Sequence, residues 1–303
     1  MRRKDLLGIR ELPVDEIMHL LQIAKEVKPK VMDKSLRDDS LKGNSISTLF
    51  YENSTRTKIS FLLAGEYLGA YADDLNIATS SVSKGETLID TGITLDSMGV
   101  NAIVIRHGMV GSAHLLARNV CASVINGGDG SNEHPTQALL DMFTMWEHKG
   151  ELKDLNVTIV GDVANSRVAK SNIWGLSKVG ANVTVAGPST LLNSNLTALG
   201  AKKVTTNVRD AVKGADVIMG LRIQLERQKA YNFPSLVEYA KFFGINEDML
   251  PLADKDVLIM HPGPVNRGVE LCTDLIDGTK SVIYEQVENG IAVRMAILKH
   301  LIG

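Results

Sequence analysis

The clearest structural signal in this 303-residue chain lies between Ser45 and Tyr67, where the sequence reads SISTLFYENSTRTKISFLLAGEY. Its beginning, residues 45–51, predicts a strand, and the polar group at 52–55 ends that strand. The rest predicts a helix whose apolar face comprises Ile59, Leu62, Leu63 and Tyr67. A strand followed directly by a helix is typical of a parallel sheet covered by helices.

The same alternation continues on both sides of this stretch. A helix that opens at Pro13 has an apolar face of Ile17, Leu20, Leu21 and Ala24. Short buried strands are predicted at 101–106, 122–125, 157–160, 183–186, 217–220 and 257–260. A glycine-rich loop, 126–133, leads into a helix from about His134 to His148. The final helix should bury a stripe of Val287, Ile291, Met295, Leu298 and Ile302.

These patterns predict an α/β protein of two doubly wound parallel-sheet domains, with the active site in the cleft between them. We expect the first domain at residues 1–149 and the second at 150–284. The C-terminal helix, 285–303, is long enough to pack back on the first domain and complete it.

Composition excludes several classes of protein. There are 33 basic and 35 acidic residues, so the net charge of −2 argues against a nucleic-acid-binding protein. The N-terminus reaches an acidic residue before any apolar run, and no stretch predicts a membrane span. Cys121 and Cys272 are isolated, which excludes a disulfide framework and fits a reducing compartment. We therefore expect a soluble cytoplasmic protein with no nucleic-acid or membrane partner.

The segment from Ser54 to Lys58, STRTK, combines three hydroxyls and two cations at the start of a helix. Free N–H groups there favour an anion, and the guanidinium of Arg56 can bind a phosphate through two hydrogen bonds. Ser54, Thr55, Arg56 and Thr57 therefore form a candidate phosphate site. The alternative is that Ser54 or Thr55 only caps the helix while the cations are solvated.

Two further candidates follow strands of the first domain. Arg106 ends the strand at 101–106, where it could reach the same anion or form a surface ion pair. His134 opens the next helix, whose dipole favours a neutral imidazole that could donate to a carbonyl oxygen. Gln137 lies about one turn further on. Alternatively, His134 is an ordinary residue at a helix start.

In the second domain, arginines again follow strand ends. Arg167 comes after a loop that lacks the GxGxxG glycines of a dinucleotide site and suits a carboxylate. Arg222 and Gln224 follow another strand, and Glu226 could orient Arg222 if the segment is extended. The alternative is that this segment is a run of charged residues exposed to solvent. The loop of Pro262, Gly263 and Pro264 presents carbonyl oxygens but few donors, because proline has no N–H. The alternative is that this loop is a plain turn.

No metal constellation, GxSxG elbow or P-loop is found, and we expect no cofactor. Four arginines, hydroxyls, one histidine, one glutamine and bare carbonyls remain. Such a set recognises a small anionic substrate and polarises it without covalent catalysis.

Seven motifs in this order resemble the aspartate/ornithine carbamoyltransferase family across essentially the whole chain: FYENSTRTKISF, SSVSKGETLIDT, VIRHG, GDGSNEHPTQALLD, GDVANSRVAKSN, LRIQLER and HPGPVNRGVE. The resemblance implies transfer of the carbamoyl group of carbamoyl phosphate to the amino group of L-aspartate. The products would be N-carbamoyl-L-aspartate and phosphate, in the committed step of pyrimidine synthesis.

The resemblance also implies a role for each residue. The phosphate would contact Ser54, Thr55, Arg56 and Thr57. The carbonyl oxygen would contact Thr57, Arg106 and His134, and the carbamoyl NH2 would contact Gln137 and the carbonyls of Pro262, Gly263 and Pro264. L-aspartate would contact Arg167, Arg222 and Gln224. Ser80 and Lys84 would reach a neighbouring subunit's site, implying a homotrimer. Whether regulatory chains or a dihydroorotase partner bind this trimer is left open by the sequence.

Three other functions compete with this interpretation. An ornithine carbamoyltransferase would resemble relatives with an HCLP loop, whereas this chain reads HPGP, and Arg222 would repel a cationic side chain. An inactive scaffold need not keep Arg56, Lys84, Arg106, His134 and Arg167. A nicotinamide dehydrogenase fits the fold but lacks its glycine fingerprint.

Overall fold

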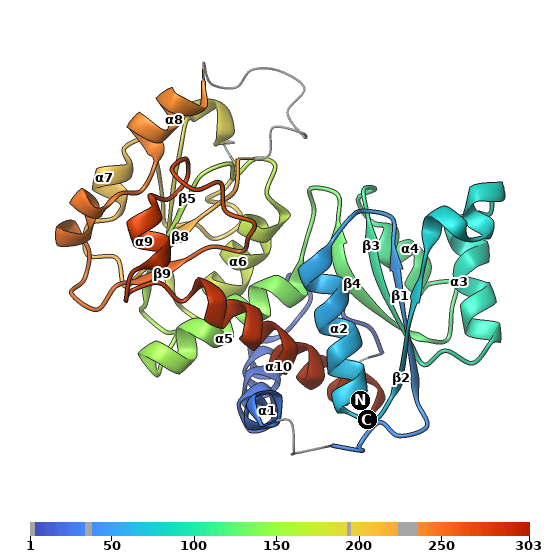
Figure 1. Ribbon diagram of the computed structural model, residues 1–303. Coiled ribbons are helices and arrows are strands. Elements are labelled where there is room, and N and C mark those ends of the chain that lie inside the picture. Colours follow the sequence, from blue (N-terminus) through green and yellow to red (C-terminus); the bar gives the residue numbers. More distant parts are fainter. Residues whose placement is uncertain (1–3, 34–37, 193–194, 224–234) are drawn as a thin grey trace. The chain divides into compact units, whose positions relative to one another are not determined.

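The computed structural model describes residues 4–33, 38–192, 195–223 and 235–303 (Figure 1). The chain forms two compact units. The first unit comprises Met1–Phe143 and Val287–Gly303, and the second comprises Thr144–Gln286. None of the helices described has the length and apolar character needed to cross a lipid bilayer.

The first unit contains a parallel four-stranded sheet in the order β2-β1-β3-β4. Because β1 pairs with both β2 and β3, the direction of winding reverses between β1 and β3. In chain order the elements are α1 (Val14–Met32), β1 (Ser45–Phe50), α2 (Thr55–Tyr67), β2 (Tyr71–Leu75), α3 (Leu88–Ser97), β3 (Ala102–His107), α4 (Ser112–Ala117) and β4 (Ser123–Asp129).

The second unit contains a parallel five-stranded sheet in the order β7-β6-β5-β8-β9, which reverses between β5 and β8. Its elements are β5 (Asn156–Val160), α6 (Arg167–Lys178), β6 (Asn182–Ala186), β7 (Lys203–Thr205), α7 (Val208–Ala211), β8 (Val217–Gly220), α8 (Leu236–Phe243), β9 (Leu258–Met260) and α9 (Thr273–Asp277). The unit boundaries fall inside two helices, α5 (Pro135–Lys149) and α10 (Ile283–Ile302).

The predicted two-sheet α/β fold is confirmed, with corrections to individual elements. Residues 126–129, predicted as loop, continue β4, which shifts register against β3 between Ile105 and His107. Gly127 allows this approach, because a Cβ there would lie 3.1 Å from the Ile105 carbonyl oxygen. Strands β2 and β7 were not predicted. Both lie at sheet edges. An edge strand pairs with a neighbour on one side only and is more open to solvent, so its residues need not be uniformly apolar.

Helix faces were predicted with mixed success. The face of α1 is confirmed, with Ile17, Leu20, Leu21 and Ala24 buried. The face predicted for α2 is wrong, because Ile59 is 48% exposed while Phe61, Ala64 and Gly65 are buried. A Cβ on Gly65 would lie 2.9 Å from Ile46 Cδ1, so small residues let α2 approach β1 closely. In α10, likewise, Val287 is exposed.

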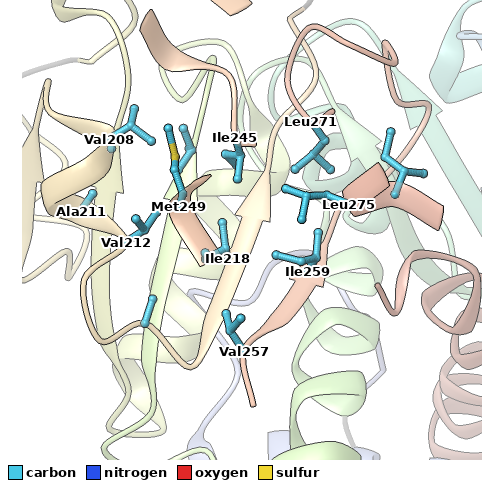
Figure 2. Close-up of a cluster of buried hydrophobic side chains, with 14 of the residues drawn as sticks. Val208, Ala211, Val212, Ile218, Ile245, Met249, Val257, Ile259, Leu271 and Leu275 are labelled. Carbon is cyan, nitrogen blue, oxygen red and sulfur yellow. The ribbon is translucent and has the colours of Figure 1, made fainter. Parts of the chain in front are cut away.

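The core of the second unit gathers side chains from β5, β6, β8 and β9 and from the helices beside the sheet (Figure 2). Ile218 of β8 and Ile259 of β9 lie among apolar residues of α7 and α9. The labelled members are Val208, Ala211, Val212, Ile218, Ile245, Met249, Val257, Ile259, Leu271 and Leu275. This packing fixes β8 and β9, and therefore the loops that follow them.

A buried carboxylate, Asp38, ties the end of α10 to the beginning of the first unit. Lys30 Nζ and Lys299 Nζ lie 2.6 and 3.0 Å from Asp38 Oδ2, and the Ser40 amide donates to Oδ1. Burial raises the pKa of Asp38, but the hydrogen bonds from Lys30, Ser40 and Lys299 together outweigh it and hold that pKa well below its usual range. Ionised Asp38 therefore stabilises the packing of α10 in this unit.

Replacing Asp38 with asparagine is expected to remove a pH-dependent part of the stability. A carboxyl with a lowered folded-state pKa stabilises the fold above its unfolded pKa of about 3.9 and loses this contribution progressively as the pH falls towards the folded value. The urea midpoint of Asp38→Asn should lie below that of the parent at neutral pH, and the gap should narrow below about pH 4. Asp39→Asn, at the adjacent exposed position, is the matched control. A gap that stays constant would contradict this role.

Candidate active site

The first group of candidate residues lies at the carboxyl ends of β1 and β3, where the first sheet reverses direction. Phe50, the last residue of β1, pairs with Arg106 of β3. The segment 54–57 follows β1 directly, so the topology brings it to the same sheet edge as Arg106. Ligands of open α/β sheets bind at such reversal points.

The start of α2 has the features of an anion site. Ser54 occupies the N-cap position, but its side chain accepts no capping hydrogen bond, so capping does not account for its hydroxyl. The first turn of α2 contains no acidic residue, and Arg56 is exposed. Lys58 points elsewhere, since its Nζ lies 2.9 Å from Asp74 Oδ2. The helix N-terminus, the hydroxyls and the guanidinium of Arg56 are the kinds of donor that suit an anion.

Arg106 is held at the end of its strand by two contacts. Its Nε lies 3.5 Å from Glu52 Oε2, and its Nη1 donates to the Gly127 carbonyl oxygen over 3.3 Å. Both Arg106 and Glu52 are half-buried. Arg106 thus forms an ion pair with Glu52, as the alternative interpretation expected. This pair lies where the sheet reverses direction, and it orients the Arg106 guanidinium there.

The structure brings together two candidates that lie 77 positions apart. Thr57 Oγ1 and His134 Nε2 are separated by 3.5 Å, and both residues are buried. The turn before His134 is fixed by Glu133, which accepts hydrogen bonds from the amides of Ile9 (2.7 Å) and Arg10 (3.4 Å). Thr57 and His134 can therefore act on one oxygen atom of a ligand.

Ser80 and Lys84 lie on a different part of the first unit. Two short 3₁₀ turns, η1 (Ile77–Thr79) and η2 (Ser81–Lys84), follow the edge strand β2; Ser80 lies between them and Lys84 ends the second. Ser80 Oγ accepts from the Val82 amide and donates to the Ile77 carbonyl oxygen, so these contacts are local. Lys84 is thus exposed after an edge strand, while Ser80 is half-buried.

The second group of candidates lies at the carboxyl ends of β5 and β8, the reversal point of the second sheet. Val160 pairs with Gly220, so Arg167 and Arg222 follow neighbouring strand ends. Arg167 is the first residue of α6 and only 4% exposed, and Ser166 caps that helix by accepting from the Ala169 amide. Gln224 and Glu226 lie outside the described residues.

The backbone beside Arg222 is held by a buried carboxylate, Glu270. Its Oε1 accepts from the Ile223 amide over 2.8 Å, and its Oε2 accepts from the Asn266 amide over 2.8 Å. Burial raises the pKa of Glu270, although these hydrogen bonds oppose the shift. Glu270 thus connects the segment containing Arg222 to the segment after residues 262–264.

The loop at residues 262–264 follows β9 and lacks available donors. Gly263 has a left-handed backbone (φ 67°), and its N–H donates to His261 Nδ1 over 2.9 Å. The His261 amide in turn donates to Gln286 Oε1. Because the two prolines have no N–H, this loop has only carbonyl oxygens with which to bind a ligand. Such oxygens suit an amide NH2 or an amine.

Three side chains that support the candidates were not predicted: Glu52, Asp141 and Glu270. Asp141 accepts a hydrogen bond from Gln137 Nε2 over 2.9 Å. The spacing of four residues on a predicted helix was a signal that could have identified this pair. For Glu52 and Glu270, the sequence holds no comparable signal, because Arg106 and Ile223, the partners beside the candidate arginines, lie far away in the sequence.

Comparisons with known proteins agree with this geometry. Residues 4–147 match the carbamoyl-P binding domain, and residues 153–301 match the Asp/Orn binding domain, of the aspartate/ornithine carbamoyltransferases. The aspartate carbamoyltransferase catalytic subunit of Acetivibrio thermocellus is 60% identical over 298 residues, covering 98% of this chain and 95% of that protein. That of Ruminiclostridium cellulolyticum is 56% identical with the same coverage.

Solved structures are similar over the same length. Aspartate transcarbamoylase from Trypanosoma cruzi, in complex with N-(phosphonacetyl)-L-aspartic acid, has a TM-score of 0.90 at 27% identity and covers 100% of this chain and 97% of its own. Ornithine carbamoyltransferase from Pyrococcus furiosus has a TM-score of 0.84 at 33% identity, covering 97% and 96%. Both domain models match, and relatives of over half identity match end to end. The chain belongs to the aspartate/ornithine carbamoyltransferase family.

Proposed function

We propose that this chain is a carbamoyltransferase that transfers the carbamoyl group of carbamoyl phosphate to the amino group of L-aspartate. The products are N-carbamoyl-L-aspartate and phosphate, in the committed step of de novo pyrimidine (UMP) biosynthesis. The observation that carries this proposal is the full-length match, at 60% identity, to a protein named aspartate carbamoyltransferase catalytic subunit.

In this proposal, the residues at the start of α2 bind the phosphate group. Ser54, Thr55, Arg56 and Thr57 donate to its oxygens, and Arg56 neutralises charge on the leaving group. Thr57, Arg106 and His134 donate to the carbonyl oxygen, where negative charge develops during attack. The 3.5 Å separation of Thr57 Oγ1 and His134 Nε2 supports this role. One preorganised donor of this kind contributes roughly 2.7–4 kcal/mol to the transition state.

The candidates of the second unit serve L-aspartate. Arg167 binds the α-carboxylate, while Arg222 and Gln224 bind the side-chain carboxylate. The carbonyl oxygens of Pro262, Gly263 and Pro264, together with Gln137, hold the carbamoyl NH2. The deprotonated amine attacks the carbonyl carbon, the carbon–oxygen bond to phosphate breaks, and the leaving phosphate takes up the amine proton. No enzyme nucleophile is needed, and holding two reactants together supplies about 7–11 kcal/mol.

Ornithine is the alternative acceptor, because an ornithine carbamoyltransferase is among the similar solved structures. Arg222 argues against it, since a guanidinium repels a cationic side chain and attracts a second carboxylate. An inactive scaffold is disfavoured by the retained phosphate-binding set. The acceptor is therefore the sharpest point at which to test the proposal.

We also propose a homotrimer in the cytoplasm, with Ser80 and Lys84 completing a neighbouring subunit's site. The exposed position of Lys84 supports this assembly. Cys121 and Cys272 are both free, which supports a reducing compartment. Regulatory chains or a dihydroorotase partner could bind such a trimer.

The test is a ureido-product assay with carbamoyl phosphate and either L-aspartate or L-ornithine. We expect product from L-aspartate, with kcat/KM at least about 100-fold above that for L-ornithine, because a buried carboxylate site leaves its arginines unpaired with the wrong substrate. A preference for L-ornithine would assign the alternative function. Absence of product from either amino acid, in a folded preparation that binds carbamoyl phosphate, would assign the scaffold.

A further inference from the structure

The side-chain amide of Gln137 has one allowed orientation. Gln137 and Asp141 lie one turn apart on α5, and Gln137 Nε2 donates to Asp141 Oδ1 over 2.9 Å in a buried setting. An ionised carboxylate can only accept hydrogen bonds, so the NH2 end of the amide must face Asp141. The oxygen end, Oε1, is then directed away from Asp141 and can only accept.

A buried arginine from the C-terminal helix interacts electrostatically with Asp141. Arg294 of α10 is 3% exposed, and its guanidinium stacks 5.2 Å from the centre of the Phe61 ring. Burial lowers the pKa of Arg294 to about 9, and the charge of Asp141 opposes that shift. Arg294 is therefore cationic at neutral pH, and a neighbouring cation favours the carboxylate form of Asp141.

The absence of a side chain at Gly290 leaves room for the Arg294 guanidinium. Its Nη1 donates to the Gly290 carbonyl oxygen over 2.9 Å. A Cβ at Gly290 would lie 2.5 Å from the same Nη1, so any larger residue there would displace the guanidinium. The buried cation of Arg294 on α10 and the carboxylate of Asp141 on α5, far apart in sequence, thus interact electrostatically.

We propose that Asp141 and Arg294 are positioning residues that make the site select a carbamoyl group over an acyl group of the same shape. They hold Gln137 Oε1 as an acceptor for the NH2 of the transferred group. This inference rests on the proposed function, because it requires Gln137 to contact the carbamoyl group. Acetyl phosphate, with CH3 in place of NH2, leaves the acceptor unpaired and is rejected for that reason.

The experiment compares carbamoyl phosphate with acetyl phosphate in the variant Asp141→Asn. Asparagine can donate or accept, so the Gln137 amide is no longer restricted to one orientation. We expect the dissociation constant of carbamoyl phosphate to rise by about 10- to 100-fold, while that of acetyl phosphate changes by less than about twofold. A role limited to stability would weaken both ligands equally, and that outcome would overturn the inference.

A double-mutant cycle tests whether Asp141 acts through Gln137. In a Gln137→Ala background, Asp141→Asn should cause no further loss of affinity for carbamoyl phosphate. An equal loss in both backgrounds would separate Asp141 from Gln137 and refute the proposal. Asp96→Asn is the matched control, because Asp96 accepts hydrogen bonds from the Cys121 and Ala122 amides in the same unit. It should lower stability without changing the ratio between the two phosphates.

Arg294→Gln provides a second variant in case Asp141→Asn does not fold. A buried carboxylate that has lost its cation takes up a proton and can then donate, so Gln137 loses its fixed orientation. The ratio of affinities for carbamoyl phosphate and acetyl phosphate should fall, as in Asp141→Asn, and an unchanged ratio would contradict the proposal. Failure of the parent protein to form ureido product would instead refute the proposed function, because these binding ratios need no turnover.

Discussion

Replacing Arg56 with alanine is expected to lower kcat by about three orders of magnitude, the largest effect of any single substitution considered for this protein. Arg56 is exposed in the first turn of α2, beside the hydroxyls of Ser54 and Thr55. In the proposed reaction it neutralises charge on the departing phosphate, an interaction that strengthens as the bond breaks. Because such an interaction acts mainly in the transition state, kcat should fall more than the substrate affinity does.

The measurement is release of phosphate and ureido product at saturating carbamoyl phosphate and L-aspartate. Lys58→Ala is the matched control, since Lys58 is a cation of the same helix that pairs with Asp74 instead. It should change kcat by less than about threefold, because this half-buried ion pair lies outside the proposed site and contributes little. A folded Arg56→Ala protein with near-parental kcat would remove Arg56 from the mechanism.

Mixing two inactive variants, Lys84→Ala and His134→Ala, is expected to restore activity if sites are shared between subunits. A site is intact when one chain supplies His134 and its neighbour supplies Lys84. In randomly mixed cyclic trimers, about one site in four meets this condition, so about a quarter of parental activity should return. Each variant alone should be nearly inactive, because each lacks one group of the proposed site.

Subunit exchange is verified with two different affinity tags, and hybrids carrying both tags are assayed; one of the three sites in each hybrid is intact, so about a third of parental activity is expected there. The control mixes Arg56→Ala with His134→Ala, since both side chains come from the same chain in the proposed site. That mixture should stay inactive. Every chain in it lacks either Arg56 or His134, and a site needs both residues from the same chain. Verified hybrids of Lys84→Ala and His134→Ala that show no activity would contradict a shared site.

Most of the fold was predictable because its signals are local. The strand at 45–50 and the helix at 55–67 were recognisable from an apolar run, a polar break and helical spacing. Their exposed and buried faces were less so: Ile59 was expected inside and is 48% exposed. The close approach of Gly65 to Ile46 determines that face, and a side chain that is absent leaves no hydrophobic signal.

The sequence pattern also failed to predict the edge strand β2 and the last residues of β4. β2 contains Asp73 and Asp74, and Thr48 and Lys58 satisfy Asp74 from the neighbouring strand and helix. A charged segment becomes a strand here because tertiary partners compensate its charges, which no local pattern reveals. The same applies to residues 126–129, whose pairing with β3 extends β4 into a glycine-rich stretch.

The sequence by itself determined the chemistry available: which polar residues follow strands and open helices, since strand ends and helix starts are adjacent in the chain. Tertiary structure alone decided which of them meet. The strand orders place the two reversal points beside Arg106 and Arg222, and helix packing lets the charge of Arg294 act on Asp141, the partner of Gln137. These contacts join residues far apart in sequence, so they depend on strand order and packing geometry, which are properties of the folded chain rather than of any segment.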